Sequence, residues 1–297
     1  MNKSKAYSGV LTVAAVIIAV SLAFAGKFGD LSGEELKNTP SNDVVAVHFF
    51  DVGQGDSEFI ELPDGKCMLI DAAVGECGGD IVREIRELGY RRLDFVVATH
   101  PHSDHIGGMS EVISAFDIGE IYMPRVSANT EVYENLLMTI AEKGLEANIA
   151  SAGKSVYSVS EVDIEILAPS CDNYGEINDY SAVVKITYGE SSFLFTGDAE
   201  KVSEREMLER DYALLDADVL KVAHHGSDTS STSEFISAVS PDYAVISCGK
   251  GNSYGHPDSE TLRTLNDCGA EFYRTDEVGT VTISCDAFDN YNIIWGD

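Results

Sequence analysis

Short apolar runs alternate with amphipathic stretches along most of the chain. Runs of four to eight residues bounded by Gly, Pro, Asn or Asp are typical of strands, and apolar residues three and four positions apart are typical of helices. Strands are predicted at residues 44–50, 57–62, 66–70, 94–98, 121–123, 162–167, 182–188, 192–195, 219–223, 243–247, 271–274, 278–284 and 291–295. Helices are predicted at residues 80–88, 106–116, 130–143, 200–210, 233–239 and 259–268. Two strand-rich halves with their own helices predict an α/β fold, with two sheets packed face to face and helices outside.

The N-terminal pattern is different and predicts export. Two lysines precede an apolar stretch at residues 10–25 that ends in an Ala-Phe-Ala site, the three parts of a secretory signal. The alternative is an uncleaved membrane anchor, since the stretch is only slightly shorter than the roughly 17 residues that can span a bilayer. We therefore expect a signal or anchor at 1–25, a linker at 26–43 and one domain at 44–297. The domain is expected to be secreted or extracytoplasmic, with residues 10–25 as its membrane attachment if they are retained.

The charge balance limits the partners of the domain. The chain has 20 Lys and Arg against 50 Asp and Glu, for a net charge of -30. This argues against the basic track that extended nonspecific binding of nucleic acid needs. A phosphodiester substrate is still compatible, because bound divalent ions supply local positive charge. If basic contacts such as Lys221 and Arg274 matter, activity on DNA should fall steeply with added salt.

The six cysteines give weaker information. An even number in an exported chain permits up to three disulfides. Their spacing contains no C-x-x-C pair, so a structural zinc site is not expected.

The densest cluster of chemically competent residues follows the predicted strand at 94–98. His100, His102, Asp104 and His105 fall within six residues, and Gly107-Gly108 comes directly after them. Imidazole nitrogen and carboxylate oxygen are ligands for zinc and similar first-row ions. A surface accident does not account well for this density. The spacing favours two ions. In a turn that leaves a strand, His100 and His102 can point the same way, while Asp104 and His105 can reach a neighbouring point across the loop.

Two later strands also end in residues that can bind metal. One run ends in Thr196-Gly197-Asp198, and the other, at 220–227, contains His224 and His225. Open α/β sheets carry their sites at the carboxyl ends of strands. We therefore expect these residues to converge with the His-rich loop.

Together, these motifs resemble the metallo-β-lactamase superfamily, and within it the hydrolase-like domain at the C-terminus of ComEC competence proteins. The resemblance covers nearly all of residues 44–285 in order. The segments that carry it are 50–57, the His-rich loop, 178–184, 196–200, 221–227, 252–257 and 273–276. It implies a four-layer αββα sandwich with a two-metal site at one edge.

The resemblance also implies a ligand set for two divalent ions, zinc or manganese. The first ion would be held by His100 and His102, the second by Asp104, His105 and His224, and Asp198 would bridge them. Lactamases and lactonases usually offer a third histidine to the first ion, but this chain has no histidine between His105 and His224. Asn178 and Ser181 occupy that region. The open position is therefore expected to take water, Asp179 or a substrate oxygen.

Further roles are expected for residues around this centre. Asp104 and Asp198 would orient the nucleophile, and His225 would protonate the leaving oxygen or contact phosphate, unless it only supports His224 or faces solvent. The residues expected to bind substrate are Ser227, Asn252 and His256, with helix capping as the alternative for Ser227. Structural roles are predicted for His48, Asp51, Asp56 and Asp71, the last as an anchor for the His-rich loop.

The leading hypothesis is an exported metal-dependent phosphodiesterase, with extracellular DNA as a candidate substrate and therefore a candidate nuclease activity. One alternative is hydrolysis of another ester, namely a phosphocholine ester, a lactone or a β-lactam, of which the missing third histidine disfavours the last two. The other is a noncatalytic DNA-binding or uptake component that retains the fold. No stable protein partner is inferred.

Overall fold

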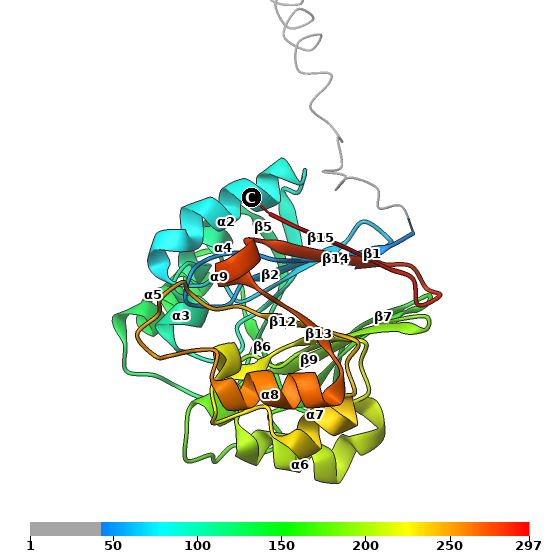
Figure 1. Ribbon diagram of the computed structural model, residues 1–297. Helices are drawn as coiled ribbons and strands as arrows, with labels where there is room; N and C mark the ends of the chain where they lie inside the picture. Colours follow the sequence, from blue (N-terminus) through cyan, green and yellow to red (C-terminus); the bar gives the residue numbers. More distant parts are fainter. Residues whose placement is uncertain (1–42, 297) are drawn as a thin grey trace, which may run out of the picture. The chain divides into compact units, whose positions relative to one another are not determined.

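The computed structural model describes residues 43–296. The predicted export segment at 1–25 and nearly all of the predicted linker lie outside the described residues. Within the described part, the strands form two sheets that lie face to face (Figure 1).

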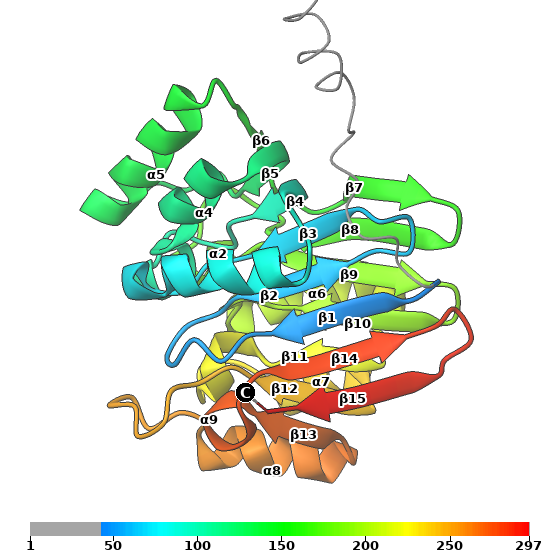
Figure 2. The same cartoon turned by 90° about the horizontal axis from the view of Figure 1, so that it is seen from above.

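The first sheet has eight strands, and its central strands run side by side in Figure 2. In spatial order they are β15 (Tyr291–Trp295), β14 (Val281–Cys285), β1 (Val45–Phe49), β2 (Glu58–Glu61), β3 (Cys67–Ile70), β4 (Arg92–Val97), β5 (Asp117–Met123) and β6 (Ala147–Ile149). The strands from β3 to β6 pair in parallel, and the others pair antiparallel.

The second sheet has seven strands and the same mixed character. In spatial order they are β13 (Glu271–Arg274), β12 (Tyr243–Ile246), β11 (Val219–Lys221), β10 (Ser191–Phe195), β9 (Val183–Tyr188), β8 (Val162–Ala168) and β7 (Lys154–Val159). The four strands β10 to β13 are parallel. Their carboxyl ends therefore lie at one edge of the sheet.

Helices cover the outer face of each sheet. On the first sheet lie α2 (Gly78–Glu87), α4 (Met109–Ala115) and α5 (Glu131–Glu142), and on the second lie α6 (Lys201–Asp211), α7 (Ser233–Val239) and α8 (Ser259–Cys268). The short helices are α3 (Ser103–Ile106) and α9 (Thr275–Val278), with 3-10 turns η1 (Gly75–Cys77), η2 (Asn178–Tyr180), η3 (Tyr212–Leu214) and η4 (Ala223–Gly226).

Strand alternation separates the cores of this sandwich. Successive side chains of a strand point to opposite faces. On β10, Phe193 and Phe195 enter the core between the sheets, whereas Leu194 enters the core under α6, α7 and α8. A third core lies between the first sheet and its helices. The predicted α/β sandwich with helices outside both sheets is confirmed.

The departures from the predicted elements have local causes. The predicted helix at 106–116 is interrupted at Gly107-Gly108, where a Cβ atom would lie 2.5 Å from the backbone oxygens of Ser103 and Ala72 respectively. The edge strands β6 and β7 were missed because few of their side chains are buried, which leaves no apolar alternation to read. The predicted strand at 278–284 begins later, because residues Thr275–Val278 form α9.

Two further findings concern the described residues. All six cysteines are free thiols, so none of the up to three disulfides that their number permits is formed. None of the helices between residues 43 and 296 has the length and apolarity that crossing a bilayer requires.

Candidate metal centre

The His-rich loop leaves β4 and is held by the buried carboxylate of Asp71. Its Oδ1 accepts from the Thr99 backbone N–H at 2.8 Å, and its Oδ2 accepts from His105 Nδ1 at 2.7 Å and from the Thr99 hydroxyl. Since the Thr99 hydroxyl donates to Asp71, its oxygen is left to accept from His100 Nδ1, 3.2 Å away. Asp71 therefore orients both imidazoles through their Nδ1 atoms, which turns each Nε2 towards the other candidate ligands. The predicted anchoring role of Asp71 is confirmed.

The turn η4 follows β11 and separates two adjacent histidines. His224 and His225 both have left-handed backbone conformations, with φ of 49° and 54°. His225 is buried, and its Nδ1 donates to the Ser247 carbonyl oxygen at 2.9 Å. Its Nε2 lies 3.4 Å from Asp104 Oδ2 and 3.8 Å from Asp198 Oδ1. His225 is thus oriented like a ligand of the second ion.

This arrangement corrects the placement expected for His224. The group that could hold the second ion comprises Asp104, His105 and His225, whose ligand atoms lie within 4.8 Å of one another. The His224 side chain is 21% exposed at the pocket, with Nδ1 2.9 Å from Thr229 Oγ1 and Nε2 3.8 Å from Asp198 Oδ2. The two histidines are exchanged relative to the sequence prediction, because the left-handed turn directs the second imidazole into the interior.

The group that could hold the first ion comprises His100, His102 and Asp198, as predicted from the resemblance. His100 Nε2 lies 3.0 Å from His102 Nδ1 and 3.6 Å from Asp198 Oδ2. Ser181 ties the group together, because its hydroxyl lies 3.3 Å from His100 Nδ1 and accepts from the Asp198 backbone N–H at 3.1 Å. Burial, reinforced by His105, holds the pKa of His100 well below its usual value, so this imidazole is neutral and able to bind metal.

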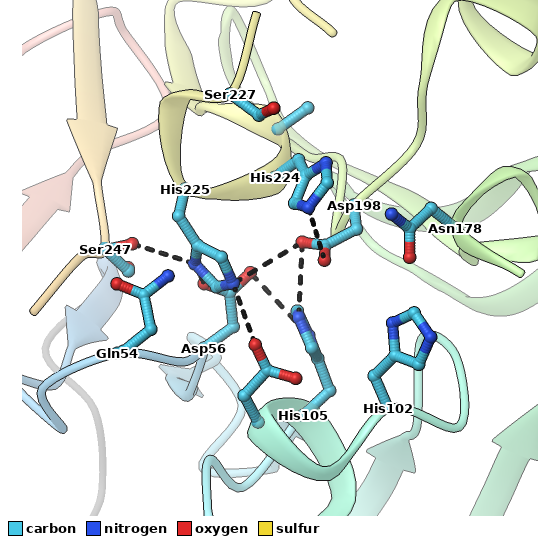
Figure 3. A network of polar contacts seen from close by, with 12 residues as sticks. Gln54, Asp56, His102, His105, Asn178, Asp198, His224, His225, Ser227 and Ser247 are labelled. Atoms are coloured by element: carbon cyan, nitrogen blue, oxygen red, sulfur yellow. Dashed lines mark hydrogen bonds and ion pairs between the residues drawn. The ribbon is translucent and has the colours of Figure 1, made fainter. Parts of the chain in front are cut away.

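Asp198 lies between the two groups (Figure 3). Its Oδ2 faces His100 and His224, while its Oδ1 lies 3.2 Å from His105 Nε2 and 3.8 Å from His225 Nε2. The two oxygens therefore face different groups of candidate ligands, so Asp198 would be shared between the two ions if both were bound.

Unpartnered polar atoms show that these residues suit a divalent metal. His105 Nε2, His225 Nε2 and Asp198 Oδ1 are buried, and none has a hydrogen-bond partner. A buried polar atom without a partner costs about 1–3 kcal/mol. Three such atoms of ligand type, contributed by three separate segments, would all be satisfied by one cation. The donor set of imidazoles and carboxylates fits a first-row ion.

Without a metal, the charges compensate one another. Burial disfavours the charged form of His225, yet the Asp198 and Asp56 carboxylates raise its pKa to about 10. The pKa of His105 is also raised despite burial, chiefly by Asp198 and Asp71. Burial opposes ionisation of Asp104, but His225, whose Nε2 lies 3.4 Å from Asp104 Oδ2, and the charge of His105 lower its pKa to about 2. A divalent ion would replace the protons on these imidazoles.

Asp56 lies beneath the centre and pairs with a buried lysine. Its Oδ2 accepts from Lys221 Nζ at 2.8 Å, and its Oδ1 lies 3.2 Å from His225 Nδ1. Asp56 also belongs to a third group that could hold a metal ion, with His105 and Asp198, so the ion pair with Lys221 does not settle the prediction that Asp56 fixes loop geometry rather than binding metal. Lys221 is 1% exposed, and Arg274 is paired with Asp276 and Glu277, so neither has the free basic side chain expected for a DNA contact.

A pocket of about 580 Å³ opens over the candidate centre. His102, Asp104, Asp198, His224 and His225 line it, and His256 lines it as predicted. The other lining residues are Gln54, Pro101, Ser103, Ser127, Ala128, Asn129, Thr130, Ile177, Asn178 and Tyr254. Among the described residues, no lysine or arginine lines this pocket. Any negative charge on a substrate must therefore be balanced by bound metal and by histidine.

Two residues predicted to bind substrate serve their own loops instead. The Asn252 side chain donates to the carbonyl oxygens of Gly249 and His256 and accepts from two backbone N–H groups. Ser227 hydrogen-bonds Thr229 and is nearly buried. Neither is among the described residues that line the pocket. Sequence reasoning missed Tyr254, whose one signal was its place in the same loop as His256.

The His48 prediction is confirmed. Its imidazole on β1 bonds Thr282 at 2.9 Å and Glu61 at 3.0 Å, and it is remote from the pocket lining.

Comparisons with known proteins agree with this geometry. A family model described as "Metallo-beta-lactamase superfamily" matches residues 50–153 and 174–250. ComE operon protein 3 of Bacillus subtilis (strain 168) is 29% identical over 252 residues, which cover 79% of this chain and 32% of that protein. Competence protein ComA of Neisseria gonorrhoeae is 31% identical over 242 residues, which cover 82% of this chain and 32% of that protein. The chain thus spans about a third of the length of these relatives.

Solved structures support the fold. The metallo-β-lactamase fold protein YhfI from Bacillus subtilis superposes with a TM-score of 0.52 at 12% identity, covering 78% of this chain and 96% of that one. The predicted resemblance to ComEC-type competence proteins is confirmed by the similarity to ComE operon protein 3 and ComA.

Proposed function

Because the chain belongs to the metallo-β-lactamase superfamily, whose members are generally metal-dependent hydrolases, we propose that it is an exported metal-dependent phosphodiesterase. The observation that carries the proposal is the convergence of unpartnered ligand atoms from His105, His225 and Asp198 beside an open pocket, which Asp198 and His225 line. When bound there, two divalent ions would lower the pKa of water towards neutrality and neutralise charge on a phosphodiester.

The residues of the chain have distinct roles in this proposal. Asp71 and the Ser247 carbonyl hold His105 and His225 in the tautomer that presents Nε2. Asp198 faces both groups of candidate ligands. Asp104, with a pKa of about 2, is ionised and can orient a water molecule by accepting a hydrogen bond from it.

The exchange of the two histidines changes the proposed proton donor. His225 is buried among the ligands, whereas His224 lines the pocket with its ring partly exposed. The Nδ1 of His224 lies 2.9 Å from Thr229 Oγ1 and 3.3 Å from Glu200 Oε1, and its Nε2 lies on the side of Asp198. We assign to the imidazolium form of His224, which carries a hydrogen on both ring nitrogens, the proton transfer from Nε2 to the leaving oxygen that the sequence suggested for His225.

Charge supports a short phosphodiester as substrate. With a net charge of -30 and no basic residue among the described pocket lining, the protein has no evident track for a long polyanion. One relative is named a competence protein, which favours DNA ends or oligonucleotides over other phosphodiesters. Lys221 and Arg274 are already paired within the protein, so we expect activity to fall only shallowly with added salt.

The test uses the purified full chain, depleted of metal and then supplied with manganese or zinc. The substrates are bis(p-nitrophenyl) phosphate and a short single-stranded oligonucleotide, with a phosphocholine ester, a lactone and a β-lactam as alternatives. Asp198→Asn should reduce phosphodiester turnover by at least about 100-fold, because it removes the bridging carboxylate. Asp172→Asn is the matched control, since Asp172 pairs with Arg125 at the surface.

Three results would count against the proposal. Phosphodiester turnover no higher than that of Asp198→Asn, with either metal, would refute it. Faster turnover of another ester would replace the substrate class. Bound metal without turnover of any ester, together with DNA binding, would favour a noncatalytic component.

Export is a separate part of the proposal and rests on the sequence of residues 1–25. Expression in a bacterial host, followed by fractionation and N-terminal sequencing, tests it. A mature protein beginning near residue 26 outside the cytoplasm is expected, and an unprocessed cytoplasmic chain would refute export.

A further inference from the structure

Asn178 places an unused oxygen beside the first ligand group. It begins η2, just before β9, and lines the pocket together with His102 and Asp198. Its side-chain Nδ2 donates to Glu200 Oε1 at 3.0 Å. The residue is only 9% exposed, and its Oδ1 is buried and has no hydrogen-bond partner. Figure 3 shows the side-chain amide beside Asp198 with its oxygen facing His102.

Chemistry fixes which amide atom faces the pocket. An ionised carboxylate accepts hydrogen bonds and donates none, so the Asn178 atom that meets Glu200 must be the NH₂ group. The carbonyl oxygen is therefore the atom directed to the ligand group. Because it can only accept, it cannot bond a phosphate oxygen, which also accepts. A cation is the partner that suits an unpaired oxygen in this place.

Neighbouring side chains are already engaged. Asp179 Oδ1 accepts from the Ser203 backbone N–H at 3.1 Å, so that carboxylate faces α6 and does not fill the open position expected from the sequence. Ser181 is bound to His100 and to the Asp198 backbone. Among residues 178–181, Asn178 Oδ1 is the buried side-chain polar atom without a hydrogen-bond partner.

We propose that Asn178 Oδ1 is the fourth protein ligand of the first ion, together with His100, His102 and Asp198. The inference rests on the proposed metal centre. It also gives the first ion a protein ligand in place of the third histidine that lactamases and lactonases usually offer. Replacing an imidazole with an amide oxygen gives two nitrogen and two oxygen donors. Oxygen donors favour manganese relative to zinc, so the first site should accept manganese more readily than a three-histidine site would.

The experiment measures metal binding rather than activity. Metal-depleted full-length chain is equilibrated with Mn²⁺ or Zn²⁺ by dialysis, and bound metal is counted by mass spectrometry. Electron paramagnetic resonance reports free and bound Mn²⁺. The variants are Asn178→Ala, Asn178→Asp and Asn178→His. Asn129→Ala is the matched control, because Asn129 lines the same pocket. Circular dichroism checks that each variant is folded.

The expected pattern is specific to a ligand role. Wild type binds two Mn²⁺ ions, and Asn178→Ala weakens one of them by at least about tenfold, the lower end of the loss seen for residues that only support a ligand. Asn129→Ala is unchanged. Asn178→Asp retains both ions because it keeps the oxygen donor, and Asn178→His shifts the Zn²⁺ to Mn²⁺ affinity ratio of that site towards Zn²⁺ by at least about tenfold.

Two outcomes would overturn the inference. Folded Asn178→Ala that binds both ions as wild type does would exclude a ligand role while leaving the proposed function intact. If Asn178→Ala does not fold, a folded Asn178→Asp that has lost one ion would have the same meaning. Failure of wild type to bind any metal would instead remove the proposed function together with the inference.

Discussion

Replacing Lys221 with methionine tests the buried ion pair under the candidate centre. Lys221 and Asp56 are each 1% exposed, and Lys221 Nζ donates to Asp56 Oδ2 at 2.8 Å and to the Val222 carbonyl at 3.0 Å. Burial opposes the charge of each group, but each stabilises the other: Asp56 raises the pKa of Lys221, and Lys221 lowers that of Asp56. Both are therefore charged at neutral pH.

The magnitude follows from the charge left behind. Lys221→Met keeps the volume of the side chain but removes the buried cation that donates to Asp56 Oδ2, and it leaves His225 Nδ1, 3.2 Å from Asp56 Oδ1, as the remaining positive partner. Burial, together with the charge of Asp56, raises the pKa of the neighbouring buried Glu58 well above its usual value. Removing one partner of a buried pair costs about 3–5 kcal/mol. For a domain of this size, this lowers the midpoint of thermal unfolding by roughly 10 °C.

Urea and thermal unfolding of the metal-free full chain measure this loss. Lys250→Met is the matched control, because Lys250 is exposed and its replacement should change stability by no more than about 0.5 kcal/mol. The double variant Asp56→Asn/Lys221→Met should recover part of the stability, since no uncompensated carboxylate remains. A loss below about 1 kcal/mol for Lys221→Met would refute the reasoning that the pair is charged and buried.

Three other predictions follow from single residues. Tyr254 is 70% exposed at the pocket and stacks on His256, so Tyr254→Ala should raise KM for a dinucleotide roughly tenfold and leave an abasic analogue unchanged; equal effects on both would exclude base stacking. Burial opposes ionisation of Glu61, but the hydrogen bonds from His48 and Tyr90 lower its pKa below the ordinary 4.5. The ionised Glu61 therefore stabilises the folded protein above about pH 4.5, and this stabilisation is lost as the pH falls through the lower pKa of the folded state. Between about pH 5 and pH 3, the free energy of unfolding in urea should therefore fall less for Glu61→Gln than for wild type. The same fall for both proteins would contradict this prediction. Cys171 is the exposed thiol, whereas burial raises the pKa of Cys67 to about 12, so peptide mapping after iodoacetamide treatment of the native protein should find Cys171 modified first; equal modification of Cys67 would contradict its burial.

The spacing of apolar residues predicted most of the helices and strands, because it shows which side chains of each segment are buried. On β10, the apolar run Phe193, Leu194 and Phe195 predicted a strand, and the structure shows its two sides entering different cores. The strand β6 carried no such signal, because its three side chains are exposed and its place depends on pairing with β5. Edge strands are set by a neighbour's hydrogen bonds, which apolar periodicity does not reveal.

The sequence by itself also determined which residue types gather at the site, since the His-rich loop and Asp198 each follow a strand whose end lies at one edge of the sandwich. Only the tertiary structure decided which of two adjacent histidines points towards the candidate metal ligands. The sequence does not distinguish His224 from His225, but two left-handed backbone conformations and the hydrogen bond to the Ser247 carbonyl direct His225 inward. Likewise, Lys221 looked like a basic contact for DNA until its burial against Asp56 became visible. Composition specifies the available donors, whereas the direction of each lone pair depends on dihedral angles and on partners distant in the chain.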